Sequence, residues 1–290
     1  MTARSVAVGK SQDSLARIAL GQLGRLLVYV VLIVLVVAVL YPLFWMVVTG
    51  FKTNQEMFGD AWGLPSQLRW ENFLSAWNQG VVRYLFNSGV VTVASVFTTV
   101  SVGALAAYAL TRLRIPLATP ITIGILGGMM LSPTIALIPL TMLLHTLGIF
   151  DTYWALIVLY TAFRIPFTVF LIRAYMLTIS KEIEDAAIVD GASRFQIFWM
   201  VILPLSRPII VSAALLQALF AWNEFVFALV FINNQDLKTL PVGLLDMQSR
   251  FLTNYPVMFA ALTLAALPML VIFLVGQRQF IRGLAEGFGK

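Results

Sequence analysis

The sequence predicts an all-α, polytopic membrane protein with six transmembrane helices, and three observations support this fold class. Apolar residues make up 60% of the 290 residues and charged residues only 11%, whereas soluble domains carry about 25% charged residues. The mean hydropathy is +0.91. The apolar residues gather in runs close to the roughly 20 residues that a helix needs to cross a bilayer. We expect spans at about 26–50, 84–110, 117–144, 152–175, 208–232 and 255–277.

The chain divides into a short polar start and one membrane domain. Residues 1–25 are polar and basic, and we expect them to form a cytoplasmic N-terminal segment ahead of a transmembrane domain at 26–290. The first apolar run is long and no small-residue cleavage site follows it, which favours an uncleaved helix over a signal peptide. Pro133 and Pro139 lie in the third predicted span, where we expect kinks.

The basic residues predict the orientation. If the N-terminus lies inside, thirteen of the 19 Lys and Arg residues fall in inner segments and Arg164 falls within a span. The five outer ones are Lys52, Arg69, Arg83, Lys238 and Arg250. Because cytoplasmic loops carry the excess of Lys and Arg, both termini are predicted to lie inside. Residues 176–207 then form a cytoplasmic loop.

Composition also argues against several kinds of chemistry. The chain has no Cys and a single histidine, His145, so we expect neither a catalytic residue set nor a metal site. It has no GxxxxGK[ST] phosphate loop, so we expect no ATPase activity and no cofactor on this chain. The net charge of +6 is accounted for by basic cytoplasmic loops, and we expect no nucleic-acid partner.

The most informative segment is EDAAIVDGASRFQIFWMVILP, residues 184–204, in the predicted cytoplasmic loop. Ser180 can cap a helix whose first turn is acidic, which complements the helix dipole. Gly191 supplies a position for positive φ. A second helix is predicted at Arg194–Ile202, and Pro204 and Pro208 end it and start the fifth span.

This segment resembles the "EAA" loop of the permease subunits of ATP-binding-cassette importers. Asp185, Ala186 and Ala187 are followed by Gly191 and then by Leu203 and Pro204 at the family spacing, with Asp185 in place of the family's Glu and Glu184 beside it. Further segments resemble the carbohydrate branch, and more closely the smaller permease of maltose-type importers. They are 51–58, 71–77, 87–96, 103–112, 150–157, 220–229 and 277–290.

The resemblance implies a location, a function, partners and docking residues. The location is a bacterial or archaeal cytoplasmic (inner) membrane. The loop would dock on an ATPase subunit and couple ATPase closure to alternating access by the membrane helices, importing a sugar or oligosaccharide. The complex would add a homologous second permease, two ATPase subunits that bind ATP and Mg, an extracytoplasmic solute-binding protein and membrane lipid. The residues implied in coupling are Glu184, Asp185, Ala186, Ala187, Asp190, Gly191, Ala192, Leu203 and Pro204. A bare amphipathic helix lying on the bilayer is the alternative for this loop.

Polar residues at membrane depth are candidates for the solute path. Arg164 and Glu224 lie within about 6 Å of the same depth at 1.5 Å per residue, so they could neutralise each other, or Arg164 could instead contact the solute. Asn223, Asn87 and Ser88 could bind sugar hydroxyls or join helices.

Three other functions are alternatives to the sugar importer. An importer of the same architecture could carry another polar or anionic solute, such as a glycerol-phosphate-like compound, and Arg164 favours this. An ion-coupled carrier would transport without ATP, but it leaves the 184–204 segment unexplained. An intramembrane enzyme lacks a catalytic set.

Overall fold

The computed structural model describes residues 3–113, 115–130, 132–250 and 254–288, and within these ranges every regular element is a helix. Four helices are long and apolar enough to cross a membrane: Gly24–Thr49, Trp70–Arg112, Tyr153–Met176 and Tyr255–Arg278. The second of these is kinked at Gly80, whose φ is +120°. Two more spans arise if each of two sharply bent helix pairs crosses the membrane as one unit. The predicted all-α membrane fold is confirmed, and the count of six spans stays a prediction.

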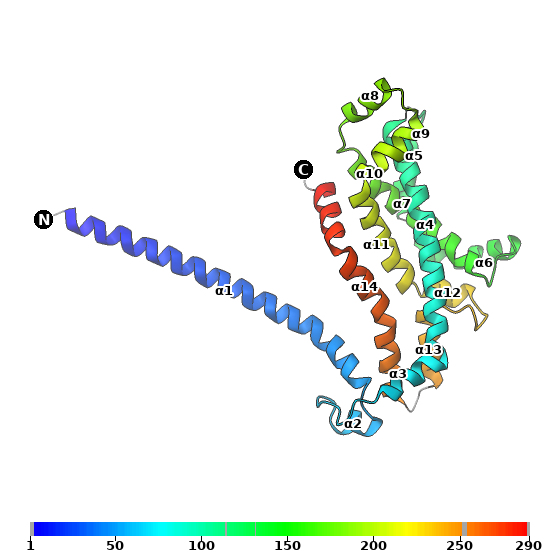
Figure 1. Ribbon diagram of the computed structural model, residues 1–290, viewed down its shortest axis with the longest axis horizontal. Coiled ribbons are helices and arrows are strands. Elements are labelled where there is room, and N and C mark those ends of the chain that lie inside the picture. The colour runs from blue at the N-terminus through cyan, green and yellow to red at the C-terminus, as the bar shows by residue number, and fades with distance from the viewer. Residues whose placement is uncertain (1–2, 114, 131, 251–253, 289–290) are drawn as a thin grey trace.

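The helices follow the chain from a long first helix to a long last one (Figure 1). In order they are α1 (Ala3–Thr49), α2 (Asn54–Gly59), α3 (Trp70–Ala76), a π-helical turn (Trp77–Val81), α4 (Val82–Arg112), α5 (Ala118–Gly128), a 3₁₀ turn (Pro133–Ala136), α6 (Leu137–Thr146), α7 (Tyr153–Met176), α8 (Lys181–Val189), α9 (Arg194–Ile197), a second π-helical turn (Phe198–Ile202), α10 (Leu203–Leu205), α11 (Arg207–Asn223), α12 (Val226–Phe231), α13 (Leu240–Arg250) and α14 (Tyr255–Phe288).

Helix α1 stands apart from the rest of the chain. It runs as one helix through the predicted boundary at residues 25 and 26 and projects away from the bundle (Figure 1). The side chains of 26–37 are all exposed. Among the side chains of α1 that the structure describes, those of its last turns contact the rest of the chain. The Trp45 ring packs edge-on against Phe259 of α14 at 5.2 Å, and Trp45 Nε1 donates to the carbonyl of Ala61 at 2.7 Å.

The compact part of the protein is a bundle in which α4 packs against α7 and α11, and α11 also packs against α14. Helices in a membrane associate through close packing, because lipid tails are as apolar as the side chains. Gly103 of α4 shows this, since a Cβ there would lie 2.7 Å from Cγ2 of Thr168 on α7. The small residue thus lets these two helices approach closely.

The two ends of the bundle are built differently (Figure 1). One end carries α8, α9 and α10. The opposite end carries α2, α3 and α13. At that end Lys52 is buried, and its Nζ donates to the carbonyls of Asp60 and Ala61, both at 3.0 Å.

Glu56, at the same end, completes a capping box with Thr53. Hydrogen bonds from Ser66 and then Thr53 lower the pKa of Glu56 to about 2. Because α14 starts beside α3, the C-terminal end of α14 points toward the α8 end.

The third and fifth predicted spans are not the single helices that were expected. Residues 117–144 form α5 and a second helical segment at Pro133–Thr146, bent by 86°. Pro133 begins that second segment, because proline has no N–H to continue a preceding helix. The kink expected near Pro133 is therefore a break.

The fifth predicted span, 208–232, ends early. Helix α11 stops at Asn223 after 17 residues, about 25 Å at 1.5 Å per residue. Glu224 is extended, and its Oε1 accepts the N–H of Phe227 at 2.8 Å at the start of α12. The early end follows because the Glu224 side chain caps a new helix in the middle of the predicted span.

Candidate functional site

The predicted coupling loop folds as two short helices joined by a glycine turn. The Ser180 side chain accepts the N–H of Glu182 at 3.2 Å and starts α8, as the sequence predicts. After α8, Gly191 has φ +84°, its N–H bonds the carbonyl of Ile188, and the N–H of Ala192 bonds the carbonyl of Ala187, each at 3.0 Å. This pair of bonds is a Schellman motif. Nothing lies within 4 Å of a Cβ built on Gly191, so the requirement for glycine comes from the backbone conformation.

The second helix of the loop is also confirmed, with a local change of winding. Ser193 and Gln196 form a capping box at the start of α9. The helical path then continues through the π-helical turn Phe198–Ile202 into α10. Near Ser206 the chain bends by 76° into α11, close to the prolines that were predicted to separate the loop from the fifth span.

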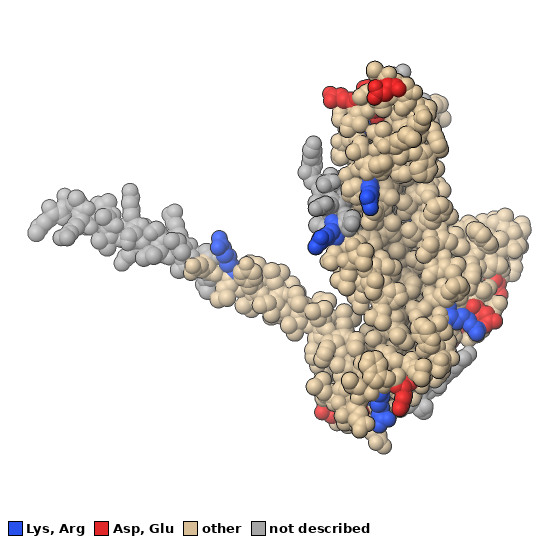
Figure 2. Space-filling model, viewed as in Figure 1, with Lys and Arg blue, Asp and Glu red and all other residues tan. Residues whose placement is uncertain are grey.

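The residues implied in coupling divide into an exposed set and an inward-facing set. The exposed residues are Asp185, Ala186, Asp190, Gly191 and Pro204. The inward-facing residues are Glu184, which is buried, and Ala187, Ala192 and Leu203, which pack on a core cluster contributed mainly by α4 and α7. Figure 2 shows acidic side chains gathered at the α8 end of the molecule. We call four of the exposed residues the coupling face: Asp185, Ala186, Asp190 and Gly191.

Glu184 is the acidic member of the predicted coupling set that does not lie on the exposed surface. Its Oε1 lies 2.8 Å from Nε of Arg112, with 6% of the Glu184 side chain and 3% of the Arg112 side chain exposed. The two atoms form an ion pair without an aligned hydrogen bond. A carboxylate this deep needs a partner, and here the partner is Arg112 within the same chain.

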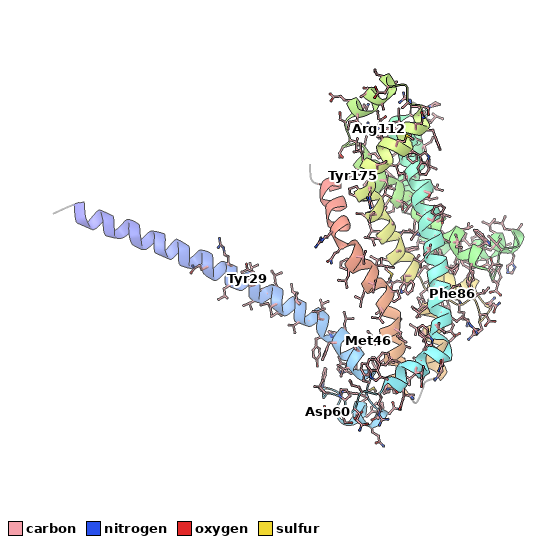
Figure 3. All side chains as sticks on the ribbon, in the orientation of Figure 1. Tyr29, Met46, Asp60, Phe86, Arg112 and Tyr175 are labelled. Atoms are coloured by element: carbon pink, nitrogen blue, oxygen red, sulfur yellow. The ribbon has the colours of Figure 1, made fainter. Side chains whose placement is uncertain are left out.

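Arg112, which sequence reasoning did not single out, is the last residue of α4 and lies beside the α8 end (Figure 3). Its Nη2 donates to the carbonyls of Met176 at 2.6 Å and Ile179 at 2.7 Å. One turn earlier on α4, the Tyr108 hydroxyl donates to the carbonyl of Arg194 at 3.2 Å. The sequence did contain a signal for this residue. Arg112 follows the predicted inner end of a span, on the same side of the membrane as a predicted loop with several Asp and Glu residues.

Two of the predicted path residues are fully engaged within the chain. Asn87 is buried, its Nδ2 donates to the carbonyls of Asp236 and Lys238 at 2.8 Å each, and its Oδ1 accepts the Tyr153 hydroxyl at 2.7 Å. Ser88 Oγ accepts the N–H of Leu240 at 2.8 Å. These bonds tie α4 to the segment before α13 and to α7, which matches the alternative that such residues join structural elements.

Of the two alternatives for Arg164, the ion pair with Glu224 does not form among the described residues. Glu224 Oε2 accepts the Tyr160 hydroxyl at 2.6 Å and the N–H of Ala228 at 3.2 Å, while Oε1 caps α12. The Arg164 guanidinium carbon instead lies 4.5 Å from the ring centroid of Phe220 and 5.0 Å from that of Phe167. Its Nε is buried without a hydrogen-bond partner. Glu224 is occupied by hydrogen-bond donors, so Arg164 is left with aromatic contacts.

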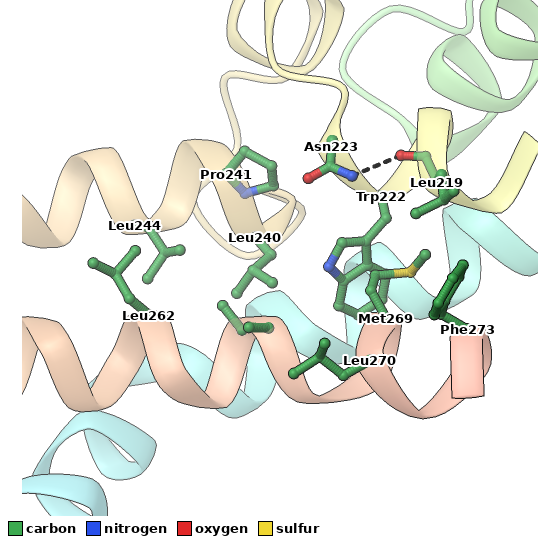
Figure 4. Close-up of a pocket in the computed structure, with 12 residues that line it drawn as sticks. Leu219, Trp222, Asn223, Leu240, Pro241, Leu244, Leu262, Met269, Leu270 and Phe273 are labelled. Carbon is green, nitrogen blue, oxygen red and sulfur yellow. Dashed lines mark hydrogen bonds between the residues drawn. The ribbon is translucent and has the colours of Figure 1, made fainter. Parts of the chain in front are cut away.

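Asn223 differs from the other predicted path residues because it lines a cavity of about 530 Å³ between α11, α13 and α14 (Figure 4). Its Nδ2 donates to the carbonyl of Leu219 at 2.8 Å in its own helix. The remaining lining is apolar, including Trp222, Leu244 and Phe273. Sugar hydroxyls need several polar partners when they leave water, and this wall offers one amide.

The described residues contain no group of three or more His, Asp or Glu side chains that could hold a metal ion. The tail segment 277–290, which carries part of the family resemblance, continues α14 as far as Phe288, but its side chains from residue 279 lie outside the described residues.

The chain is similar to a known family of membrane transport proteins over most of its length. Residues 99–285 match the family described as "Binding-protein-dependent transport system inner membrane component". A probable ABC transporter permease protein, YurM of Bacillus subtilis, is 44% identical over 92% of this chain and 89% of its own length. The melibiose/raffinose/stachyose import permease protein MelC, also of Bacillus subtilis, is 31% identical over 86% of this chain and 91% of its own length.

A solved structure supports the same fold. A chain of a bacterial ABC transporter for the import of the acidic polysaccharide alginate has a TM-score of 0.78, with 23% identity, over 89% of this chain and 97% of that chain. The likeness at this level of identity establishes the architecture of the bundle.

Proposed function

The chain belongs to the family of binding-protein-dependent transport system inner membrane components, and we propose that it is the transmembrane permease subunit of an ATP-driven importer of a sugar or oligosaccharide. The single observation that supports coupling best is the coupling face. It lies at one end of the bundle, a Schellman turn fixes its backbone, and the buried Glu184–Arg112 ion pair ties it to α4. A face made of two carboxylates, an alanine and a glycine has little bulk, so a partner can approach its backbone closely.

The solute class rests on the relatives. Those named for neutral saccharides include the melibiose/raffinose/stachyose permease, a diacetylchitobiose permease of Streptomyces coelicolor at 29% identity and a trehalose/maltose permease of Thermococcus litoralis at 31% identity. Because these relatives cover 86% or more of this chain, the shared region includes both the bundle and the coupling loop. A sugar or oligosaccharide is the solute class that accounts for this set.

In the proposed mechanism, this chain transmits motion and its partners hydrolyse ATP. Two ATPase subunits bind ATP and Mg, and one of them docks on the coupling face. When ATP closes the ATPase dimer, the 184–204 loop moves with it and the bundle opens toward the outside. A homologous second permease completes the path, and an extracytoplasmic binding protein delivers the solute. This assignment places the coupling loop and both termini in the cytoplasm, consistent with the distribution of Lys and Arg.

The test is purification of the tagged chain from its native membrane in mild detergent, with mass spectrometry of the proteins that accompany it. We expect an ATPase subunit with the wild-type chain. We expect its loss with Ala186→Trp, which adds bulk to the coupling face, and with Gly191→Val, which cannot adopt φ +84° without strain.

Gly59→Val is the matched control for this purification. Gly59 also has open space around its Cβ position, but it lies at the opposite end of the bundle and has no positive φ. This variant should retain the ATPase. Purification of the wild-type chain without an ATPase, combined with uptake that needs no ATP, would overturn the proposal in favour of an ion-coupled carrier.

A second candidate, import of an anionic solute, is favoured by one observation. Arg164 has aromatic neighbours but no carboxylate partner among the described residues, and an uncompensated cation at membrane depth is costly. An anionic group on the solute would supply the missing charge. Comparing uptake of a neutral oligosaccharide and one containing a uronic acid tests this: Arg164→Gln should reduce uptake of the acidic sugar at least tenfold with the complex still assembled. Equal uptake of both sugars by the variant and the wild type would count against it.

A further inference from the structure

We propose that Arg112 is a positioning residue that clamps the coupling helix α8 to the inner end of α4, so that the two helices move as one body during transport. This inference rests on the proposed function, because it assigns a path to the motion that an ATPase would deliver. The coupling residues that the resemblance implies lie in the loop and at its end, whereas Arg112 lies on a helix some 70 residues earlier in the chain.

The contacts of Arg112 join three elements. Nε faces Glu184 of α8 at 2.8 Å, and Nη2 bonds two carbonyls, Met176 at the end of α7 and Ile179 in the connection to α8. A guanidinium presents its donors in a planar fork, so one side chain can hold these acceptors in a fixed arrangement. Tyr108, one turn away on α4, adds its hydroxyl bond to the carbonyl of Arg194 at the start of α9.

Burial makes this joint stiff. With 3% and 6% of the two side chains exposed, separating Arg112 from Glu184 would leave a buried carboxylate without a cation, which is strongly unfavourable. Displacing α8 relative to α4 is therefore costly, while moving the two together leaves the pair intact. By contrast, the loop reaches α11 through the three-residue helix α10 and a 76° bend, a geometry that can flex.

The other end of α4 is hydrogen-bonded to a further segment of the chain, which would move with it. Asn87 and Ser88 hold the backbone of Asp236, Lys238 and Leu240 by three hydrogen bonds of 2.8 Å. Helix α4 has 31 residues, about 46 Å at 1.5 Å per residue. It therefore connects the coupling helix at one end of the bundle to the segment ahead of α13 at the other. We assign α4 as the element that carries motion between them.

The same helix offers a matched control. Arg83, near the start of α4, forms an ion pair with Asp236, and the side chains are 56% and 69% exposed. Exposed pairs of this kind contribute little to stability. Removing both charges here neutralises another arginine of α4 and its carboxylate partner without touching the clamp.

The experiment compares two double variants in the complete transport complex reconstituted in vesicles. Arg112→Gln with Glu184→Gln removes both charges of the clamp and leaves no unpaired ion. Arg83→Gln with Asp236→Asn does the same for the exposed pair. We expect the clamp variant to keep its ATPase subunits and its basal ATP hydrolysis within about twofold, while solute uptake falls at least tenfold. The control variant should match the wild type in all three measurements.

A second measurement follows the helices directly. The chain has no cysteine, so Val102→Cys on α4 and Lys181→Cys on α8, both at exposed positions, can carry spin labels. With the clamp intact, the distance between the labels should stay the same when ATP is added. In the clamp variant it should shift or broaden with nucleotide.

Each result decides the inference. Wild-type uptake by the clamp variant, or a label distance insensitive to nucleotide in both proteins, would overturn it. Assembly, basal hydrolysis and uptake that all fall in parallel would assign Arg112 to folding alone and would also overturn it. If the wild-type complex itself shows no ATP-dependent uptake, the proposed function fails instead, and the two failures are thus distinguishable.

Discussion

Two partly or fully buried arginines in the bundle, Arg112 and Arg164, have opposite surroundings. Arg112 meets a carboxylate and two backbone carbonyls within 2.9 Å. Arg164 meets the faces of two phenylalanine rings, and its Nε has no hydrogen-bond partner. The charge of Arg112 meets a carboxylate inside the chain, whereas that of Arg164 meets only aromatic rings, and a cation–π contact contributes about 2 kcal/mol or more in a desolvated site.

The difference separates arginines that bind groups of their own chain from arginines whose donors can bind a group from outside. An arginine whose donors are matched by its own chain fixes the arrangement of elements. An arginine left with aromatic neighbours keeps its donors available for a group from outside, such as a solute or a partner chain. Four substitutions test this distinction, each read from the thermal unfolding midpoint of the purified chain in detergent.

The largest effect is expected for Arg112→Ala. It leaves Glu184 buried without a cation, and breaking one side of a buried pair costs about 3–5 kcal/mol. We expect a strongly lowered midpoint and a reduced yield of folded chain. A midpoint close to that of the wild type would mean that water reaches Glu184 and that the joint is not closed.

A smaller effect is expected for Glu224→Gln. The amide oxygen can still accept the N–H of Phe227, but the amide nitrogen that replaces Oε2 cannot accept from Tyr160 and Ala228. Each lost hydrogen bond costs about 1 kcal/mol. If Glu224 in fact neutralises Arg164, the midpoint should instead fall as far as it does for Arg112→Ala. That result would remove the contrast between the two arginines.

Arg164→Met should leave stability unchanged or slightly raise it. The substitution gives up the cation–π contacts with Phe167 and Phe220, and it also removes the cost of holding a charge at membrane depth. The two terms offset each other to within about 1 kcal/mol. A loss of about 3 kcal/mol or more, the value for a broken buried pair, would show that Arg164 has an anionic partner inside the chain.

The smallest effect is expected for Arg83→Ala. The ion pair with Asp236 is exposed on both sides, and pairs of this kind contribute about 0–1 kcal/mol. A clear drop in the midpoint would show that the segment ahead of α13 depends on this contact as well as on Asn87 and Ser88.

Local patterns predicted the secondary structure of the coupling loop well. Ser180 caps α8, Gly191 takes positive φ, and Arg194–Ile202 is helical, because capping and glycine turns depend on neighbours in the chain. The same approach failed where a side chain redirected the backbone. Glu224 interrupts the fifth apolar run by capping α12, and hydropathy alone does not register such a cap.

The sequence by itself determined the membrane class, the helical fold and the position of the loop, because hydrophobic composition and spacing are local properties of the chain. Only the tertiary structure decided which charges meet. Arg112 and Glu184 are 72 positions apart, and Arg164 and Glu224 lie at similar predicted depth, yet the first pair forms and the second does not. Ion pairs depend on the rotation and packing of helices around their axes, and a single sequence leaves that rotation undetermined.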